Sequence, residues 1–307
     1  MTDMSKSAAA PKQKISNFRR ALWHVNRTDL GWVTKAVMGV LNNEDAAQRR
    51  KLLDALPTDP RWAQATRELR SDGYTDVSGI VSRSLAEAVA AVADEKLARA
   101  ADLANAQKLG HKAFWVSLLD EDTVDGAYPA DHTFVRYALQ PSVLRILGDF
   151  MGTLPRLVDV LLTLSQPTEK KLSYSQLWHL DHDDKRVCKL FIYLTDVTTN
   201  DDGPFTFMPA GPSRRFRNTL KSHLTDEQVF SKSDRADLVE MIAPRLSSFI
   251  VNTARCLHMG SRIAPGHKRL LYTATFIQPP SIYPDSKPRF RATAPPDELT
   301  RAVLRLT

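Results

Sequence analysis

A chain of 307 residues, 43% of them hydrophobic and 25% charged, can bury the core of one large domain or two small ones, which excludes wholesale disorder. No run approaches the ~18 apolar residues of a membrane span, because Asp159 interrupts the most tempting stretch, "RLVDVLLTLS", so we expect no membrane partner. The net charge of +7 favours anionic partners, yet no zinc-finger spacing or RNA-reading aromatic motif accompanies it. We therefore expect a small-molecule substrate, for which an anion fits the charge, and no nucleic acid.

The basic, polar segment 1–20 lacks the apolar core of a secretory signal, and we interpret it as a flexible tail. The chain has 2 cysteines, Cys188 and Cys256, which are too few for a disulfide framework. They predict two buried thiols and a reducing, cytoplasmic compartment.

Residues 21–110 are predicted to form a helical support region. Asp59 with Pro60 is a helix start signal, and Gly110 is a stop signal. Apolar residues recur at helical spacing in four stretches, residues 29–41, 43–56, 59–73 and 82–110. Between the last two, "GYTDVSGIV" predicts a short extended segment.

Residues 111–280 are predicted to form a β core. One helix is expected over 141–152, with Pro141 near its start. Turns rich in Gly, Pro, Asp and Asn separate the predicted strands, which span 112–119, 157–165, 174–180, 187–197, 204–209, 238–244, 247–253 and 270–277.

Strands that follow one another without alternating helices argue against a doubly wound sheet. They favour a double-sheet jelly roll, with the N-terminal helical layer packed on one face. We expect residues 281–307 to form a C-terminal extension that ends in a short helix, and we expect one structural domain overall.

His179 and Asp181 form the strongest chemical signal. Residues two apart on a strand point to the same side, and an imidazole with a carboxylate supplies two of the three ligands of a non-haem iron(II) facial triad. His258, which lies between two predicted strands, is the candidate for the third ligand. His182 follows Asp181 directly and is expected to point away.

Arg269 follows His258 by eleven positions and begins a predicted strand. Its guanidinium could bind a carboxylate through two hydrogen bonds. A shifted pair, His182 and Asp184, has the same spacing as the first and stays open, although the flanking Trp178 and Leu180 favour His179. Two alternatives involve no metal: His179 and Asp181 lie in a turn that faces solvent, or His258 is a buried histidine whose hydrogen bonds are satisfied within the core.

The motifs "QLWHLDHDD", "KLFIYLTDV", "DGPFTFMPAGPS" and "CLHMGSRIAPGHKRLL" together resemble the phytanoyl-CoA dioxygenase-like (PhyH-like) family over roughly residues 65–278. That family consists of iron(II)- and 2-oxoglutarate-dependent oxygenases with a double-stranded β-helix, which is a jelly roll. The resemblance implies Fe(II) on His179, Asp181 and His258, with 2-oxoglutarate and O2 as cosubstrates. It implies that Arg269 binds the distal carboxylate of 2-oxoglutarate.

Gln166 and Gln176 are further candidate contacts of 2-oxoglutarate. Some relatives have a small residue in place of the carboxylate ligand and bind halide there. Because this chain keeps Asp181, the resemblance favours hydroxylation, desaturation or ring closure over halogenation.

The surroundings of this site carry further expectations. Cys256 is expected to pack rather than to bind metal, and residues 218–230 are a candidate lid. The residues expected to line the cavity are Phe191, Tyr193 and Phe205. The basic residues Arg214, Arg215 and Arg217 are expected either to face solvent or to lie at the barrel mouth, where they would meet an anionic substrate. Two other functions stay open: a non-catalytic jelly-roll module that binds a metal or an anion, and an oxygenase acting on nucleic acid or protein.

Overall fold

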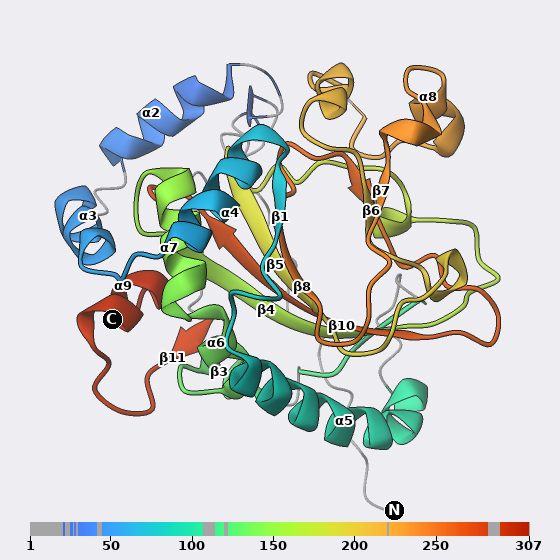
Figure 1. Cartoon of the computed structure of the whole chain (residues 1–307), viewed down its shortest axis with the longest axis horizontal. Coiled ribbons are helices and arrows are strands. Elements are labelled where there is room, and N and C mark those ends of the chain that lie inside the picture. Colours follow the sequence, from blue (N-terminus) through green and yellow to red (C-terminus); the bar gives the residue numbers. More distant parts are fainter. Residues whose placement is uncertain are drawn as a thin grey trace, which may run out of the picture.

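The structure of the protein, a computed structural model, describes residues 21, 25, 26, 28, 30–41, 45–106, 114–119, 122–219, 221–281 and 289–306. The predicted tail, residues 1–20, lies outside the described residues. The described part is a core of β-sheet with helices packed against it (Figure 1). No helix within it combines the length and the apolar character needed to cross a bilayer.

Six strands form a large sheet in which every neighbouring pair is antiparallel. Their order across the sheet is β1 (Tyr74–Asp76), β8 (Ser248–Asn252), β5 (Val187–Tyr193), β10 (Arg269–Ile277), β4 (Arg156–Ser165) and β2 (Trp115–Ser117). β1 belongs to the segment for which the sequence predicts a helical support. It extends the edge of the sheet by pairing with β8.

Three short strands form a second sheet in the order β7 (Val239–Glu240), β6 (Thr206–Phe207) and β9 (His258–Met259). A single bridge between His179 and His258 adds a further extended segment beside β9. From β4 to β10 the chain passes repeatedly between the two sheets. β4, β5, β8 and β10 lie in the large one, β6, β7 and β9 lie in the small one, and His179 pairs with the small one.

Helices cover one face of the large sheet, and the small sheet covers the other. The helices of this layer are α3 (Ala46–Asp54), α4 (Pro60–Ser71), α5 (Arg83–Ala106), α6 (Thr133–Ala138), α7 (Pro141–Met151) and α9 (Glu298–Leu304), all of which contribute to the same apolar cluster. A further helix, α2 (Gly31–Leu41), contributes no residue to that cluster. A short helix, α8 (Asp226–Phe230), lies near the small sheet at the upper right of Figure 1. β3 (Tyr128–Pro129) and β11 (Phe290–Arg291) form a separate parallel pair.

Strand periodicity divides the core into two parts. On β5, Leu190 and Ile192 pack into the cluster that includes the helices, whereas Phe191 and Tyr193 pack with residues of the small sheet. Both faces of the large sheet are therefore buried. This explains why its strands read as nearly continuous apolar runs in the sequence.

Residues 174–180 differ from the strand predicted there. A 3₁₀ turn spans Tyr174–Gln176, and extended pairing resumes only at Trp178 and His179. Tyr174 has a positive φ of 50°, and the side chains of Ser173 and Gln176 cap the turn reciprocally. These local hydrogen bonds compete with the strand pairing.

Candidate metal centre

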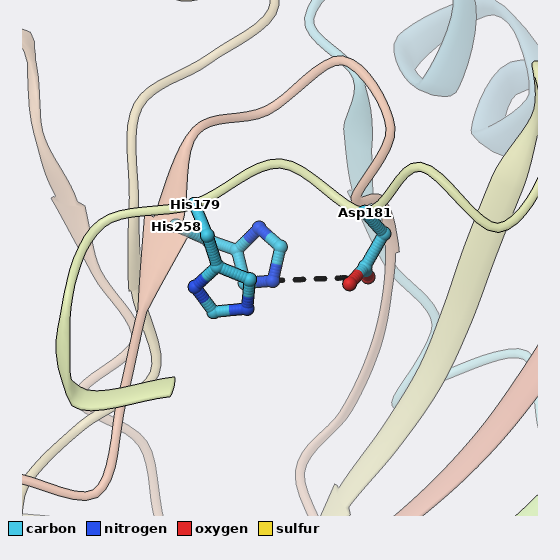
Figure 2. Close-up of side chains that lie close together, drawn as sticks. All are labelled: His179, Asp181 and His258. Atoms are coloured by element: carbon cyan, nitrogen blue, oxygen red, sulfur yellow. Dashed lines mark ion pairs between the residues drawn. The ribbon is translucent and has the colours of Figure 1, made fainter. Parts of the chain in front are cut away.

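His179, Asp181 and His258 lie close together, as Figure 2 shows, and one ligand atom from each falls within 4.8 Å of the others. The backbone of His179 donates to the carbonyl of His258 at 2.9 Å, and His258 returns the bond at 3.0 Å. This pairing places the two imidazoles side by side, with ring centroids 4.2 Å apart. The Asp181 amide donates to the Thr253 carbonyl at 3.0 Å, which turns its carboxylate back toward the rings.

Backbone carbonyls orient both imidazoles. The Nδ1 of His179 lies 2.9 Å from the carbonyl of Leu177, and the Nδ1 of His258 lies 3.0 Å from that of Cys256. Because a carbonyl can only accept, each Nδ1 carries the proton and each Nε2 presents its lone pair. This is the arrangement that metal-binding histidines adopt. The donor set therefore fits a divalent metal.

The electrostatics of the cluster suit ligands rather than a proton-bound network. Burial lowers the pKa of His179 and lowers that of His258 well below its ordinary value, so both imidazoles stay neutral. Burial opposes ionisation of Asp181, but the ammonium of Lys189 outweighs it and holds the pKa of that carboxyl well below its usual range. The Nζ of Lys189 lies 2.7 Å from Asp181 Oδ2, and His258 Nε2 lies 3.8 Å from the same oxygen.

A small cavity of about 100 Å³ begins at the two imidazoles, and we call it the inner cavity. It lies between the sheets and is lined on one side by residues at alternate positions of β10, beginning with Arg269. Phe191 and Phe205 supply apolar walls, and the ring of Phe205 lies 5.4 Å from that of His258. The cavity therefore joins the candidate metal ligands to a buried guanidinium.

Arg269 is 2% exposed and has no ion pair with a described carboxylate. Its Nη1 donates to the carbonyl of Gly203, and its Nη2 donates to the hydroxyl of Ser261 at 3.1 Å. Its Nε has no partner among the described residues. A buried cation that lacks a counter-ion is costly, so the site is suited to a ligand that brings a carboxylate into the cavity.

Three residues expected near 2-oxoglutarate or the substrate do not line the inner cavity. Gln176 is held by the carbonyl of Ser261 at 3.0 Å and by the amide of Ser173 at 3.3 Å. Gln166 extends the pairing of β4 with β2 through its backbone. The Tyr193 hydroxyl ties the two sheets together by donating to the Met241 carbonyl at 2.9 Å.

The structure separates the shifted pair from the triad. Asp184 is buried and forms an ion pair with Lys35 at 2.6 Å. His182 lines a different cavity, described below. Cys256 is buried with its Sγ 3.5 Å from the carbonyl of Gly73, and burial raises the pKa of this thiol to about 12.

Sequence reasoning missed Lys189, Trp115 and Ser261. Lys189 had a usable signal, because it lies two residues before Phe191 and therefore on the same inward face of β5. Trp115 donates through Nε1 to the Ser261 hydroxyl at 2.6 Å, beside Arg269. That contact joins residues 146 positions apart, so no short sequence pattern predicts it.

No family model and no curated protein matches the chain. Solved structures resemble it loosely. The epimerase SnoN from nogalamycin biosynthesis, described as non-heme and alpha-ketoglutarate dependent, is 18% identical over 72% of this chain and 84% of its own, with a TM-score of 0.47. EctD from S. alaskensis, solved with 2-oxoglutarate and 5-hydroxyectoine, is 16% identical over 72% and 77%, with a TM-score of 0.49. AviO1 from Streptomyces viridochromogenes Tue57 is 14% identical over 75% and 100%, with a TM-score of 0.47. At this identity and overlap, the likeness assigns no activity.

Proposed function

We propose that the chain is an iron(II)- and 2-oxoglutarate-dependent oxygenase that hydroxylates or otherwise oxidises a small molecule. The observation that carries the proposal is the convergence of His179, Asp181 and His258 at one end of a cavity lined also by the buried Arg269. Two imidazoles and one carboxylate are the ligand set of non-haem iron(II) oxygenases. The passage of consecutive strands between two sheets supports a double-stranded β-helix, or jelly roll.

Iron(II) and 2-oxoglutarate, when bound, supply the activation of O2 that oxidises a C–H bond, with succinate and carbon dioxide as by-products. The chain's own residues bind and orient. His179 and His258 offer neutral Nε2 atoms because their Nδ1 protons are held by carbonyls. Asp181 offers a carboxylate oxygen, and since this ligand is retained the proposed reaction is oxygenation, desaturation or ring closure rather than halogenation.

Arg269 would hold the distal carboxylate of 2-oxoglutarate, and its buried surroundings strengthen that attraction. Phe191, Phe205 and Leu271 line the same cavity and limit the entry of water. The dimensions support a ligand of few atoms, because the cavity holds about 100 Å³.

The test is the loss of 2-oxoglutarate turnover in His179→Ala, Asp181→Ala and His258→Ala. Each variant is expected to reduce succinate formation by at least about 100-fold, since a three-ligand site cannot spare a ligand. His267→Ala is the matched control, because its imidazole pairs with Asp202 at 2.9 Å and lines neither cavity. Succinate formation at the wild-type rate in the triad variants would refute the assignment.

Anaerobic titration with iron(II) and 2-oxoglutarate tests binding apart from turnover. Chelation of the metal by 2-oxoglutarate gives a weak visible charge-transfer band, which we expect for the wild type and not for His179→Ala. A wild-type protein that binds metal but gives no band would favour the alternative of a non-catalytic binding module.

A further inference from the structure

A second cavity, which we call the outer cavity, has a volume of about 470 Å³ and includes Asp181 in its wall. His179 and His258 line the inner cavity instead, so the candidate metal ligands stand between the two spaces. Six cationic side chains line the outer cavity: Arg70, Lys185, Arg186, Arg214, Arg217 and Arg255.

The carboxylates in this wall already have cationic partners. Asp181 pairs with Lys189 at 2.7 Å, and Asp184 pairs with Lys35 at 2.6 Å. Neither lysine lines the outer cavity. Lysines outside the wall therefore pair with both carboxylates, and the six cations that line the cavity outnumber these two acids.

Backbone carbonyls hold several of these cations in place. Arg186 donates through Nη1 to the carbonyls of Phe150 and Met151, at 3.2 and 2.7 Å. Arg70 donates to the carbonyl of Asp149, and Arg255 donates to the carbonyl of Arg70 at 3.3 Å. A carbonyl orients a guanidinium but leaves its charge intact.

The cations come from segments far apart in the sequence. Arg70 lies in α4, Arg186 precedes β5, Arg214 lies in a 3₁₀ helix (Pro212–Phe216), and Arg255 follows β8. Their convergence is a property of the fold and not of one basic stretch. Arg215, which follows Arg214 in the chain, differs from the cavity cations because it forms an ion pair with Asp237 at 2.9 Å and does not line the cavity.

We propose that the outer cavity binds the substrate through a phosphate group, so that the substrate is a phosphorylated small molecule. This inference rests on the proposed function, because Asp181 in the cavity wall would place the rest of the bound molecule beside the oxidising centre. Several guanidinium groups match the charge and the several acceptor oxygens of a phosphate better than those of a single carboxylate. The volume suits a small molecule. Because the cations line a cavity, they are better placed to bind a small molecule than the backbone of a nucleic acid.

The experiment measures anion binding calorimetrically with the full-length, metal-free protein, using inorganic phosphate, pyrophosphate and acetate as probes. We expect phosphate and pyrophosphate to bind and acetate to bind at least about tenfold more weakly. The double variant Arg214→Gln/Arg255→Gln should weaken phosphate binding by at least about tenfold, the effect of losing one or more charged hydrogen bonds. The control Arg215→Gln should bind as the wild type does.

Folding and the inner cavity are checked separately. The double variant should keep the thermal midpoint of the anion-free wild type within a few degrees and should bind 2-oxoglutarate with metal as the wild type does, because Arg269 lies in the inner cavity. Failure of the wild type to bind phosphate, equal loss in Arg215→Gln, or tighter binding of a short oligonucleotide than of pyrophosphate would each overturn the proposal. A protein that binds phosphate but shows no 2-oxoglutarate turnover would leave the phosphate site standing and remove the proposed function.

Discussion

Lys189 places a positive charge where a metal ion would also lie. Its Nζ is 2.7 Å from Asp181 Oδ2, and both side chains are largely buried. Without metal, this ion pair prevents Asp181 from being a buried carboxylate with no close cation. With metal bound, the ammonium and the metal ion would share one carboxylate, so we expect the lysine to oppose metal binding.

Replacing Lys189 by Met should therefore have opposite effects on the two states. The metal-free variant is expected to lose about 2 kcal/mol of unfolding free energy, because half of a buried pair is gone. Adding Ni²⁺ should raise the thermal midpoint of the variant by more than it raises that of the wild type, since a metal that binds the folded state stabilises it. Scanning calorimetry with and without Ni²⁺ measures both effects.

Lys35→Met is the matched control for that comparison. It breaks a similar ion pair with Asp184, at 2.6 Å, outside the triad. Its midpoint should fall without Ni²⁺, while the gain on adding Ni²⁺ stays at the wild-type value. Equal Ni²⁺ gains in Lys189→Met and Lys35→Met would disprove the antagonism.

In the proposed function, Arg269 is the residue that would bind the distal carboxylate of 2-oxoglutarate. Arg269→Gln keeps polar atoms but removes the charge and the forked donors, so we expect the Kd for 2-oxoglutarate to rise by about 10- to 100-fold. The affinity for Ni²⁺ alone should change little, because the metal ligands are untouched. Titrations of metal-loaded protein with 2-oxoglutarate provide the measurement, and an unchanged Kd would exclude Arg269 from the cosubstrate site.

At the scale of elements, α8 is tied to the strand segment that carries His179. Asp226, the first residue of α8, accepts hydrogen bonds from Trp178 Nε1 at 2.8 Å and from two nitrogens of Arg262 at 2.9 and 2.8 Å. The bonds from Arg262 are the main cause that lowers the pKa of this carboxyl below its ordinary value of 3.8. The stabilisation they give is present above that ordinary value and is lost as the pH falls through the lowered pKa.

Asp226→Asn should lower the unfolding free energy at pH 7 by about 1 kcal/mol, a modest figure because the carboxylate is 40% exposed. The difference from wild type should shrink below about pH 4 and vanish at lower pH. Glu227→Gln removes a charge from the same helical turn without these bonds, so its cost should be smaller. Denaturant unfolding at several pH values distinguishes them, and a difference that is independent of pH would contradict the account.

The elements that sequence reasoning recovered are those with long patterns. Apolar runs marked β4, β5 and β10, and the Asp59-Pro60 signal marked α4, whose N-cap is Asp59. Three short elements escaped, because six-residue α6 and two-residue β3 and β11 carry too little periodicity to stand out, whereas the equally short β6 and β7 lie within apolar segments that the sequence marks. The candidate lid 218–230 stays a prediction, with α8 held through Asp226.

At the scale of the whole molecule, the two faces of the large sheet differ in what packs against them. The helical side holds the larger apolar core, and the opposite side holds the inner cavity and the candidate ligands. Sequence spacing could predict this division and could pair His179 with Asp181. It could not predict the outer cavity, because Arg70 reaches it through the packing of α4 against β1 and β8, and Arg255 reaches it through the turn in which the Thr253 carbonyl accepts from the Asp181 amide.

Adjacent residues of β5 test the division, because Leu190 faces the helices and Phe191 faces the inner cavity. Leu190→Ala should cost about 3 kcal/mol of unfolding free energy by leaving a cavity in the helical core. The Kd for 2-oxoglutarate should stay within about twofold of wild type, since the cavity wall is untouched.

Phe191→Leu should give the reverse pattern. Phe191 packs against Phe205 and Phe249, with ring centroids 4.5 and 5.1 Å away, so leucine keeps an apolar wall while widening the cavity. We expect a cost of about 1 kcal/mol in stability and a rise of about threefold or more in the Kd for 2-oxoglutarate, the effect of losing roughly one buried methylene contact. Denaturant unfolding and cosubstrate titration on both variants measure the two quantities. If Leu190→Ala disturbed cosubstrate binding as much as Phe191→Leu does, the two faces of the sheet would not be independent, and the helical layer would have to be counted as part of the binding site.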